Sequence, residues 1–258
     1  MGLVESEAIV LRTYNLAEAD KIVVCLTRTA GVVRAVARGA RRLKSKYGAG
    51  LEPHTLLSLS FYEKEGRELV SLRDAEIVRS YFHLSGSAEL MGALAYMSEL
   101  VLEFAPPHEP NEKLFRMVKA CLEALALEPA GAQALIGYFE VWMLKLAGFL
   151  PNMKICADCS RRLAGEAVVY LNAESRPRCY ACSKGQGMPL RGEAHGQIED
   201  AQRLSPGEFA RVYGAAANGP RVEVAQVTGR LIERILERAP RTQSPPRGER
   251  GSGETHFG

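Results

Sequence analysis

The sequence contains no uninterrupted apolar run of about 18 residues, which is the length that a membrane-spanning helix needs. It also lacks the GxxxxGK(S/T), GxGxxG and HExxH motifs, which bind phosphate groups, dinucleotides and catalytic zinc. Histidine is scarce, and the five that occur stand singly: His54, His83, His108, His195 and His256. We find no constellation of residues typical of covalent chemistry, so the sequence favours a protein that neither spans a membrane nor acts as an enzyme.

The opening MGLVESEAIVLR has no basic region and no long apolar core, so we do not expect it to act as a secretory signal. Cys25 and Cys121 lie inside apolar patterns and are expected to be buried thiols. Together these features favour a reducing compartment, and we expect a cytoplasmic protein.

The net charge is only +3, but it is unevenly distributed along the chain. Residues 1–50 contain nine Lys or Arg and four Asp or Glu, residues 51–150 contain eight and fourteen, and residues 151–258 contain sixteen and twelve. A basic front, an acidic middle and a basic rear favour a polyanion-binding surface that is local rather than spread over the whole protein.

The most specific motif consists of two pairs of cysteines, Cys156 with Cys159 and Cys179 with Cys182. Two residues separate the members of each pair and nineteen separate the pairs, which is the sequence form of a four-sulfur zinc site. A CxxC turn directs two sulfur atoms to one point, so two such turns can supply a tetrahedron. No histidine lies between the pairs, and the sequence therefore predicts one structural zinc ion held by sulfur alone.

Other interpretations of these cysteines remain open from the sequence. They could form two disulfides or be unrelated thiols. A redox CxxC motif is a further alternative, but it normally follows a strand inside a βαβ unit, and no such unit precedes Cys156.

The first eighty residues contain five short runs rich in Val, Ile, Leu and Thr, which predict strands at residues 8–11, 21–27, 32–37, 55–62 and 68–73. In the fourth run Leu57, Leu59 and Phe61 alternate with polar residues, so one face is expected to be buried. With a hairpin loop at residues 63–67, the pattern fits a small antiparallel barrel. An OB-fold is the natural candidate, although other five-stranded barrels share this pattern.

From Ser87 the apolar period becomes helical. Three stripes are predicted, ending before the prolines at 106, 129 and 151: Leu90, Leu94, Met97, Val101 and Phe104; Leu114, Val118, Cys121, Leu122 and Leu125; and Leu135, Phe139, Trp142, Leu146 and Phe149. The third segment is apolar on most sides and is expected to be central in a bundle. Later, Ser205 and Glu208 predict a capping box, and a last helix is expected to end before Pro240.

A cluster of cations follows the third predicted strand, with five Lys or Arg in the nine positions from Arg38 to Lys46. No acidic residue occurs between Asp20 and Glu52. Flexible cations beside a barrel can follow a phosphate backbone, and Tyr47 could stack on a base. Weaker extensions of this patch are Arg34, Arg12 and Lys21. The alternative interpretation is an ordinary solvated loop.

Several segments occur in an order that is specific in combination: residues 7–12, 18–21, 26–28, 31–42, 111–115 and 138–140, and residues 146–151 running into the first cysteine pair. With these segments the chain resembles the bacterial RecO family of recombination mediators, from about residue 7 to about residue 238. Two departures are visible. The segment from residue 237 onward is unlike the usual ending, and not every family member keeps the four cysteines, so zinc is not expected to be essential for DNA binding.

The resemblance implies binding to single- and double-stranded DNA, annealing of complementary strands, and a role in loading RecA onto coated single strands. The implied partners are RecR and the acidic C-terminal tail of single-stranded-DNA-binding protein (SSB), and the implied location is the nucleoid. The family's basic motif matches Arg34, Arg38, Arg41, Arg42, Lys44 and Lys46 as the expected DNA contacts.

We therefore predict an α+β protein with an N-terminal five-stranded OB-fold barrel, a central helical bundle and an inserted four-cysteine zinc module. The expected parts are a DNA-binding barrel at 1–80, a helical domain at 81–154 and 188–240, the zinc module at 155–187 and a disordered tail at 241–258. The alternatives are a zinc-ribbon nucleic-acid-binding module in transcription or RNA metabolism, and an enzyme with a structural zinc.

Overall fold

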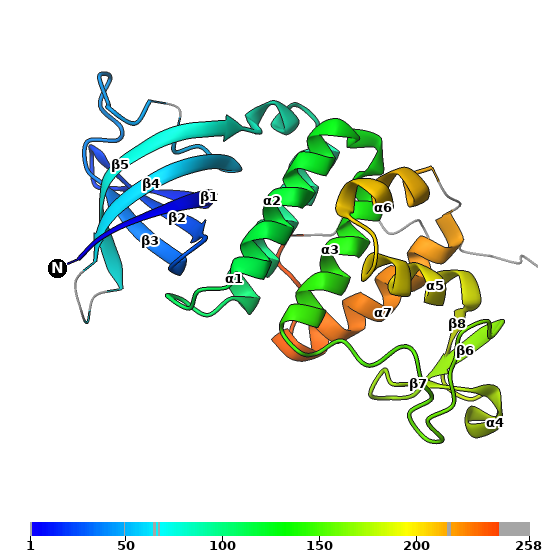
Figure 1. Ribbon diagram of the computed structural model, residues 1–258. Helices are drawn as coiled ribbons and strands as arrows, with labels where there is room; N and C mark the ends of the chain where they lie inside the picture. The colour runs from blue at the N-terminus through cyan, green and yellow to red at the C-terminus, as the bar shows by residue number, and fades with distance from the viewer. Residues whose placement is uncertain (1, 49, 64–65, 67, 216–217, 243–258) are drawn as a thin grey trace, which may run out of the picture.

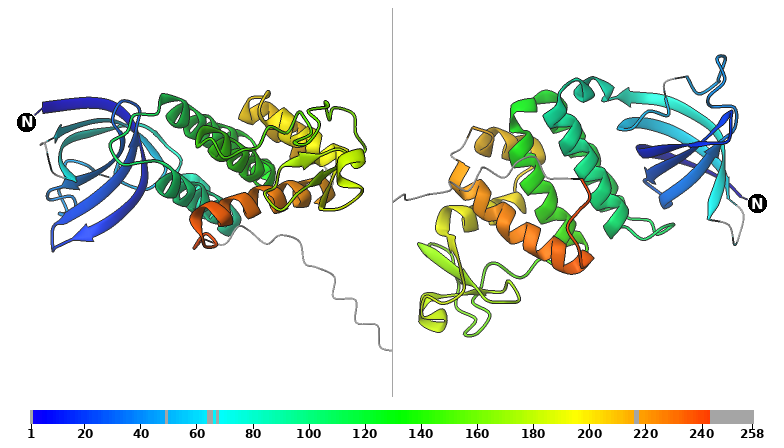
Figure 2. Two further views of the ribbon diagram at one scale, coloured as in Figure 1. Left: turned by 90° about the horizontal axis from the view of Figure 1, so that it is seen from below. Right: turned by 180° about the vertical axis from the view of Figure 1, so that it is seen from behind.

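A computed structural model describes residues 2–48, 50–63, 66, 68–215 and 218–242 of the chain. A barrel lies at one end, helices lie in the middle, and a small three-stranded sheet lies at the other end (Figure 1). Figure 2 shows the same spatial order of the three parts from two further directions. The predicted α+β class is confirmed. The predicted tail is described only at residues 241 and 242, and positions 64, 65 and 67 of the predicted hairpin loop also lie outside the described residues.

The barrel consists of β1 (Gly2–Leu16), β2 (Asp20–Thr27), β3 (Gly31–Ala37), β4 (Thr55–Glu63) and β5 (Leu69–Ser80). These strands close in the order β1-β2-β3-β5-β4, and all neighbours are antiparallel except β3 and β5, which run parallel. The number and position of the predicted strands are confirmed, although β1 and β5 extend well beyond the predicted runs. A register shift in β1 between Val10 and Arg12 is typical of a bulge that bends a long strand.

The two faces of the barrel strands have different roles. Leu57, Leu59 and Phe61 point into the interior, where each is at most 1% exposed, as the alternation in β4 predicts. Outward-facing Ile9 and Leu11 are also buried, because Leu94 and Met97 of the neighbouring helix lie against them. One side of the barrel is therefore covered by helices.

The helical part is built from α1 (Ala88–Phe104), α2 (Glu112–Leu127), α3 (Ala132–Leu146), α5 (Gly192–Ala201), α6 (Pro206–Tyr213) and α7 (Asn218–Leu236), with short 3₁₀ segments at Phe82–Gly86 and Pro129–Gly131. Ser87 and Asn111 cap α1 and α2, and the capping box of Ser205 and Glu208 is confirmed at α6. Among the described helices, none combines the length and the apolar character needed to cross a bilayer.

The helix α3 is central, as predicted, with ten of its fifteen residues buried. One residue of its predicted stripe is placed differently: Phe149 lies beyond the end of α3 and is 50% exposed. Gly148, with φ +78°, turns the chain just before it, so the helical period no longer applies there.

The small sheet contains β6 (Val168–Leu171), β7 (Pro177–Arg178) and β8 (Met188–Arg191), and the short helix α4 (Tyr180–Ser183) follows β7. The predicted strand between the cysteine pairs is therefore confirmed. Leu171 and Leu190 of this sheet belong to the same buried cluster as α3 and α7. One continuous core thus joins the helical part to the cysteine-bearing sheet, whereas the barrel interior forms a second, separate core.

Candidate functional site

The four paired cysteines converge on one point. The sulfur atoms of Cys156, Cys159, Cys179 and Cys182 all lie within 4.8 Å of one another. The sulfur atoms of Cys159 and Cys179 are 3.8 Å apart. A tetrahedral zinc ion with Zn–S bonds near 2.3 Å requires sulfur–sulfur separations of roughly 3.8 Å, so the cluster has the size of such a site.

Two tight turns build this cluster. The backbone N–H of Ser160 donates to Cys156 O at 2.9 Å, and that of Cys182 donates to Cys179 O at 3.2 Å. The backbone N–H of Cys179 also donates to the sulfur of Cys156 at 3.4 Å. Burial by itself would raise the pKa of Cys156, but backbone N–H groups of Cys159, Cys179 and Asp158 outweigh it and lower the pKa to about 6.

The donor set therefore fits a metal ion that prefers thiolates. None of the cysteines, all of which are described, is paired in a disulfide, so the disulfide alternative is not supported. Four sulfur ligands leave no position open for water or substrate, which is typical of a structural site. Cys25 and Cys121 are fully buried elsewhere, as expected.

The predicted cationic residues form a second site on the barrel. Arg34 lies on the outer face of β3, and Arg38 directly follows the last residue of this strand. The loop that continues from Arg38 projects clear of the helices (Figures 1 and 2). All six predicted DNA contacts are exposed: Arg34, Arg38, Arg41, Arg42, Lys44 and Lys46. None of the ion pairs between described residues involves these six side chains. Their charge is thus available to an anion.

The cationic loop is attached to the barrel through its backbone and by two of its cations. The N–H of Gly39 donates to Asp20 Oδ1 at 2.7 Å, and the N–H of Arg41 donates to Ala19 O at 2.9 Å. The guanidinium of Arg41 donates to Ala17 O at 3.0 Å, and Lys46 donates to the backbone oxygen of Arg73. The loop therefore packs on the turn between β1 and β2 while its charges face solvent.

The proposed stacking role of Tyr47 is not supported by its position. Its side chain is only 4% exposed and belongs to the interior core of the barrel. Its hydroxyl donates to Leu72 O at 3.2 Å, and the ammonium of Lys46 lies 5.0 Å from its ring centroid. Tyr47 therefore anchors the end of the loop, and its ring offers no free face to a base.

We expect Tyr47→Leu to lower stability and leave DNA affinity unchanged. The substitution removes a buried ring and one hydrogen bond, which should cost about 1–3 kcal/mol in the free energy of unfolding. Denaturant unfolding measures that cost, and titration of a labelled oligonucleotide measures affinity. A tenfold loss of affinity in a variant that remains folded would restore the stacking role.

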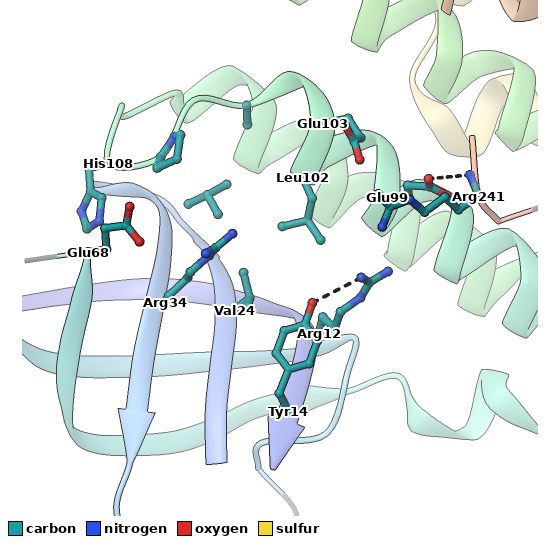
Figure 3. Close-up of a pocket in the computed structure, with 13 residues that line it drawn as sticks. Arg12, Tyr14, Val24, Arg34, Glu68, Glu99, Leu102, Glu103, His108 and Arg241 are labelled. Carbon is teal, nitrogen blue, oxygen red and sulfur yellow. Dashed lines mark hydrogen bonds between the residues drawn. The ribbon is translucent and has the colours of Figure 1, made fainter. Parts of the chain in front are cut away.

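A pocket that the sequence did not predict lies between the barrel and α1 (Figure 3). The pocket has a volume of about 320 Å³. Arg12, Val24 and Arg34 lie side by side across β1, β2 and β3, and all three line it. Tyr14, 48% exposed, lies next along the same face of β1, and its hydroxyl accepts a hydrogen bond from Arg12 at 3.3 Å.

Period-two alternation along β1 is the signal that could have found Tyr14, because it places residues 12 and 14 on one face. Lys21, which was also suggested as an extension of the patch, is engaged elsewhere. Its ammonium lies 3.3 Å from a carboxylate oxygen of Glu52. The extension of the cationic face is thus Arg12 rather than Lys21.

Two family models match the chain over separate ranges. The one described as "Recombination protein O N terminal" matches residues 1–81, and the one described as "Recombination protein O C terminal" matches residues 86–244. The barrel and its cationic loop lie in the first range, and the helices with the cysteine cluster lie in the second. Both matches are to a recombination protein, and together they cover most of the chain, so the class is that of proteins of DNA recombination and repair.

Curated relatives extend over the same length. The chain is 34% identical over 222 residues to "DNA repair protein RecO" of Anaeromyxobacter sp. (strain K), covering 85% of this chain and 84% of the relative. It is 31% identical over 241 residues to the protein of the same name from Rubrobacter xylanophilus, covering 93% and 90%. The chain belongs to the RecO family, which confirms the resemblance drawn from its sequence.

Proposed function

We propose that this protein is a recombination mediator that binds single- and double-stranded DNA and anneals complementary strands. The observation that carries the proposal is the continuous cationic track from Arg12 and Arg34 along β3 to the loop of Arg38, Arg41, Arg42, Lys44 and Lys46. Family membership supports it, because the relatives are named as DNA repair proteins.

The barrel topology supports an OB-fold that binds DNA with the surface typical of this fold. OB-folds bind oligonucleotides on the face of strands 2 and 3 and with the loop between strands 1 and 2. Here Arg34 lies on β3, and the cationic loop is held against the β1–β2 turn by Arg41. We therefore assign residues 1–80 to DNA binding, and the helical domain to 81–154 and 188–240.

A second cationic surface supports annealing. On the cysteine-bearing module at residues 155–187 and just before it, Lys154, Arg162, Arg176 and Lys184 are exposed and take part in none of the ion pairs between described residues. Two strands repel through their phosphates, and cations on two faces of one protein screen that repulsion. Base pairing then proceeds by its own energetics, so the mechanism includes no bond-making step. We propose one structural zinc ion in the cysteine cluster, which would hold this second surface in shape.

The proposed partners are RecR and the acidic tail of SSB, and the proposed outcome is RecA loading on coated single strands. The helical part is the expected site for the acidic tail. These assignments rest on family membership.

An annealing assay with SSB-coated complementary strands tests this function. We expect the protein to join the coated strand, to accelerate pairing, and to be retained by a peptide carrying the SSB tail but not by one with its acidic residues replaced. A zinc-ribbon module of transcription or RNA metabolism should bind bare nucleic acid and show neither effect. Failure of both effects in protein that binds bare DNA would overturn the mediator assignment.

A further inference from the structure

The residues that follow α7 cross over α1 and bind its carboxylates. We name residues 238–242 the C-terminal strap. The guanidinium of Arg238 lies 2.5 Å from a carboxylate oxygen of Glu103 and 3.7 Å from one of Glu99. The backbone N–H groups of Arg241 and Thr242 donate to Glu99 at 2.6 and 2.7 Å, and the Thr242 hydroxyl also donates to it. The strap therefore places the guanidinium of Arg238 beside both carboxylates in the C-terminal half of α1, and it gives Glu99 three further hydrogen bonds.

Those two carboxylates lie in the pocket beside the cationic barrel face. Arg12 and Arg34 rise from the barrel strands, and Glu99 and Glu103 come from α1 on the opposite wall (Figure 3). Arg241 of the strap also lines this pocket. Within the described part of the chain, neither barrel arginine has an ion-pair partner, whereas both α1 carboxylates are paired with Arg238 of the strap.

Glu99 stays charged in this arrangement. Its side chain is only 5% exposed. Burial by itself would raise the pKa of this carboxyl, but the hydrogen bonds from Thr242 and Arg241, together with Arg238, outweigh it and lower the pKa. Without the strap, a charged Glu99 and Glu103 would face Arg12 and Arg34, attract them, and repel any phosphate in the pocket.

We propose that the C-terminal strap is an electrostatic mask. By neutralising Glu99 and Glu103, it keeps Arg12 and Arg34 free for the phosphates of a single DNA strand, whose path then runs from this pocket along β3 to the cationic loop. The strap lies within residues 86–244, the range that the C-terminal family model matches. This inference rests on the proposed DNA-binding function.

A double-mutant cycle on the full chain tests the mask. The first change is truncation after Glu237, which removes the strap. The second change is the double substitution Glu99→Gln and Glu103→Gln, called the Gln pair. Binding of a labelled oligothymidylate is measured at low salt. We expect truncation to weaken binding by about five- to tenfold and the Gln pair to restore the truncated chain to within about twofold. In the chain with its strap, the Gln pair should change affinity by less than about twofold, because the carboxylates are already neutralised.

Two controls separate the possible outcomes. Truncation after Thr242 keeps the strap and should bind like the full chain. If truncation after Glu237 unfolds the protein, the variant Arg238→Gln of the full chain takes the place of the truncation. Its matched control is Arg234→Gln, which also removes one cation but does not touch the α1 carboxylates, because Arg234 donates to Ala173 O. The mask would be overturned if the Gln pair raised DNA affinity equally with and without the strap, or if truncation caused no loss of DNA affinity. Absence of DNA binding by the full chain would overturn the proposed function itself.

Discussion

Replacing Arg41, Arg42 and Lys44 together by Ala is expected to weaken binding to single-stranded DNA by about tenfold or more near 0.1 M salt. These side chains are exposed, and no described acidic side chain neutralises them. Each phosphate contact to a single strand adds about 0.7 to the slope of log affinity against log salt, so the slope should fall by about two units. Titrations of a labelled oligonucleotide at several salt concentrations measure both quantities.

The same variant should fold normally, which makes its loss of affinity interpretable. The backbone bonds from Gly39 to Asp20 and from Arg41 to Ala19 are retained, and Tyr47 still anchors the loop. Only the exposed bond from the Arg41 guanidinium to Ala17 is lost, at a cost of roughly 1 kcal/mol or less.

A matched control removes the same charge elsewhere. Lys113 and Arg116 on α2 and Arg211 on α6 are exposed cations outside the barrel, and their replacement by Ala should leave the salt slope nearly unchanged. Equal losses in the two triple variants would show that net charge, rather than this loop, determines binding. Unchanged affinity and slope in the loop variant would remove the loop from the DNA-binding surface.

The sequence predicts features whose cause is local. The CxxC spacing fixes how two sulfur atoms converge, and the alternation of Leu57, Leu59 and Phe61 fixes which face of β4 is buried, so both were readable without a structure. Exposure of the loop cations follows from the cost of burying unpaired charge.

Features that depend on how distant parts of the chain pack together could not be predicted from the sequence. Tyr47 follows a run of cations, but whether its ring turns to solvent or into the barrel depends on how the loop closes over Leu72. The strap joins positions more than a hundred residues apart, Glu99 and Arg241, and no sequence period connects them. Arg12 and Arg34 become neighbours of α1 only because the barrel packs against the helices.

Loss of the metal is expected to have the largest effect on stability. Protein purified without chelator should contain one zinc ion per chain by metal analysis, and Cys156→Ser should abolish most of it. Binding energy at a structural zinc is folding energy, about 10–16 kcal/mol in small zinc peptides, so the variant should lose at least about 3 kcal/mol of unfolding free energy. Cys121→Ala, which alters a buried thiol outside the cluster, should keep one zinc per chain.

The loss of stability caused by metal removal should be confined to the cysteine-bearing sheet and the helices beside it. Leu171 and Leu190 continue the core of α3 and α7, so loss of the cysteine cluster should reduce amide protection in β6, β8 and the helices beside them. The barrel interior is a separate core, so β1 to β5 should keep their protection, and oligonucleotide binding at the cationic loop should persist. Hydrogen exchange measured with and without chelator separates the two regions. A Cys156→Ser protein that remains fully stable but no longer anneals strands would mean instead that the cysteine module contacts DNA directly.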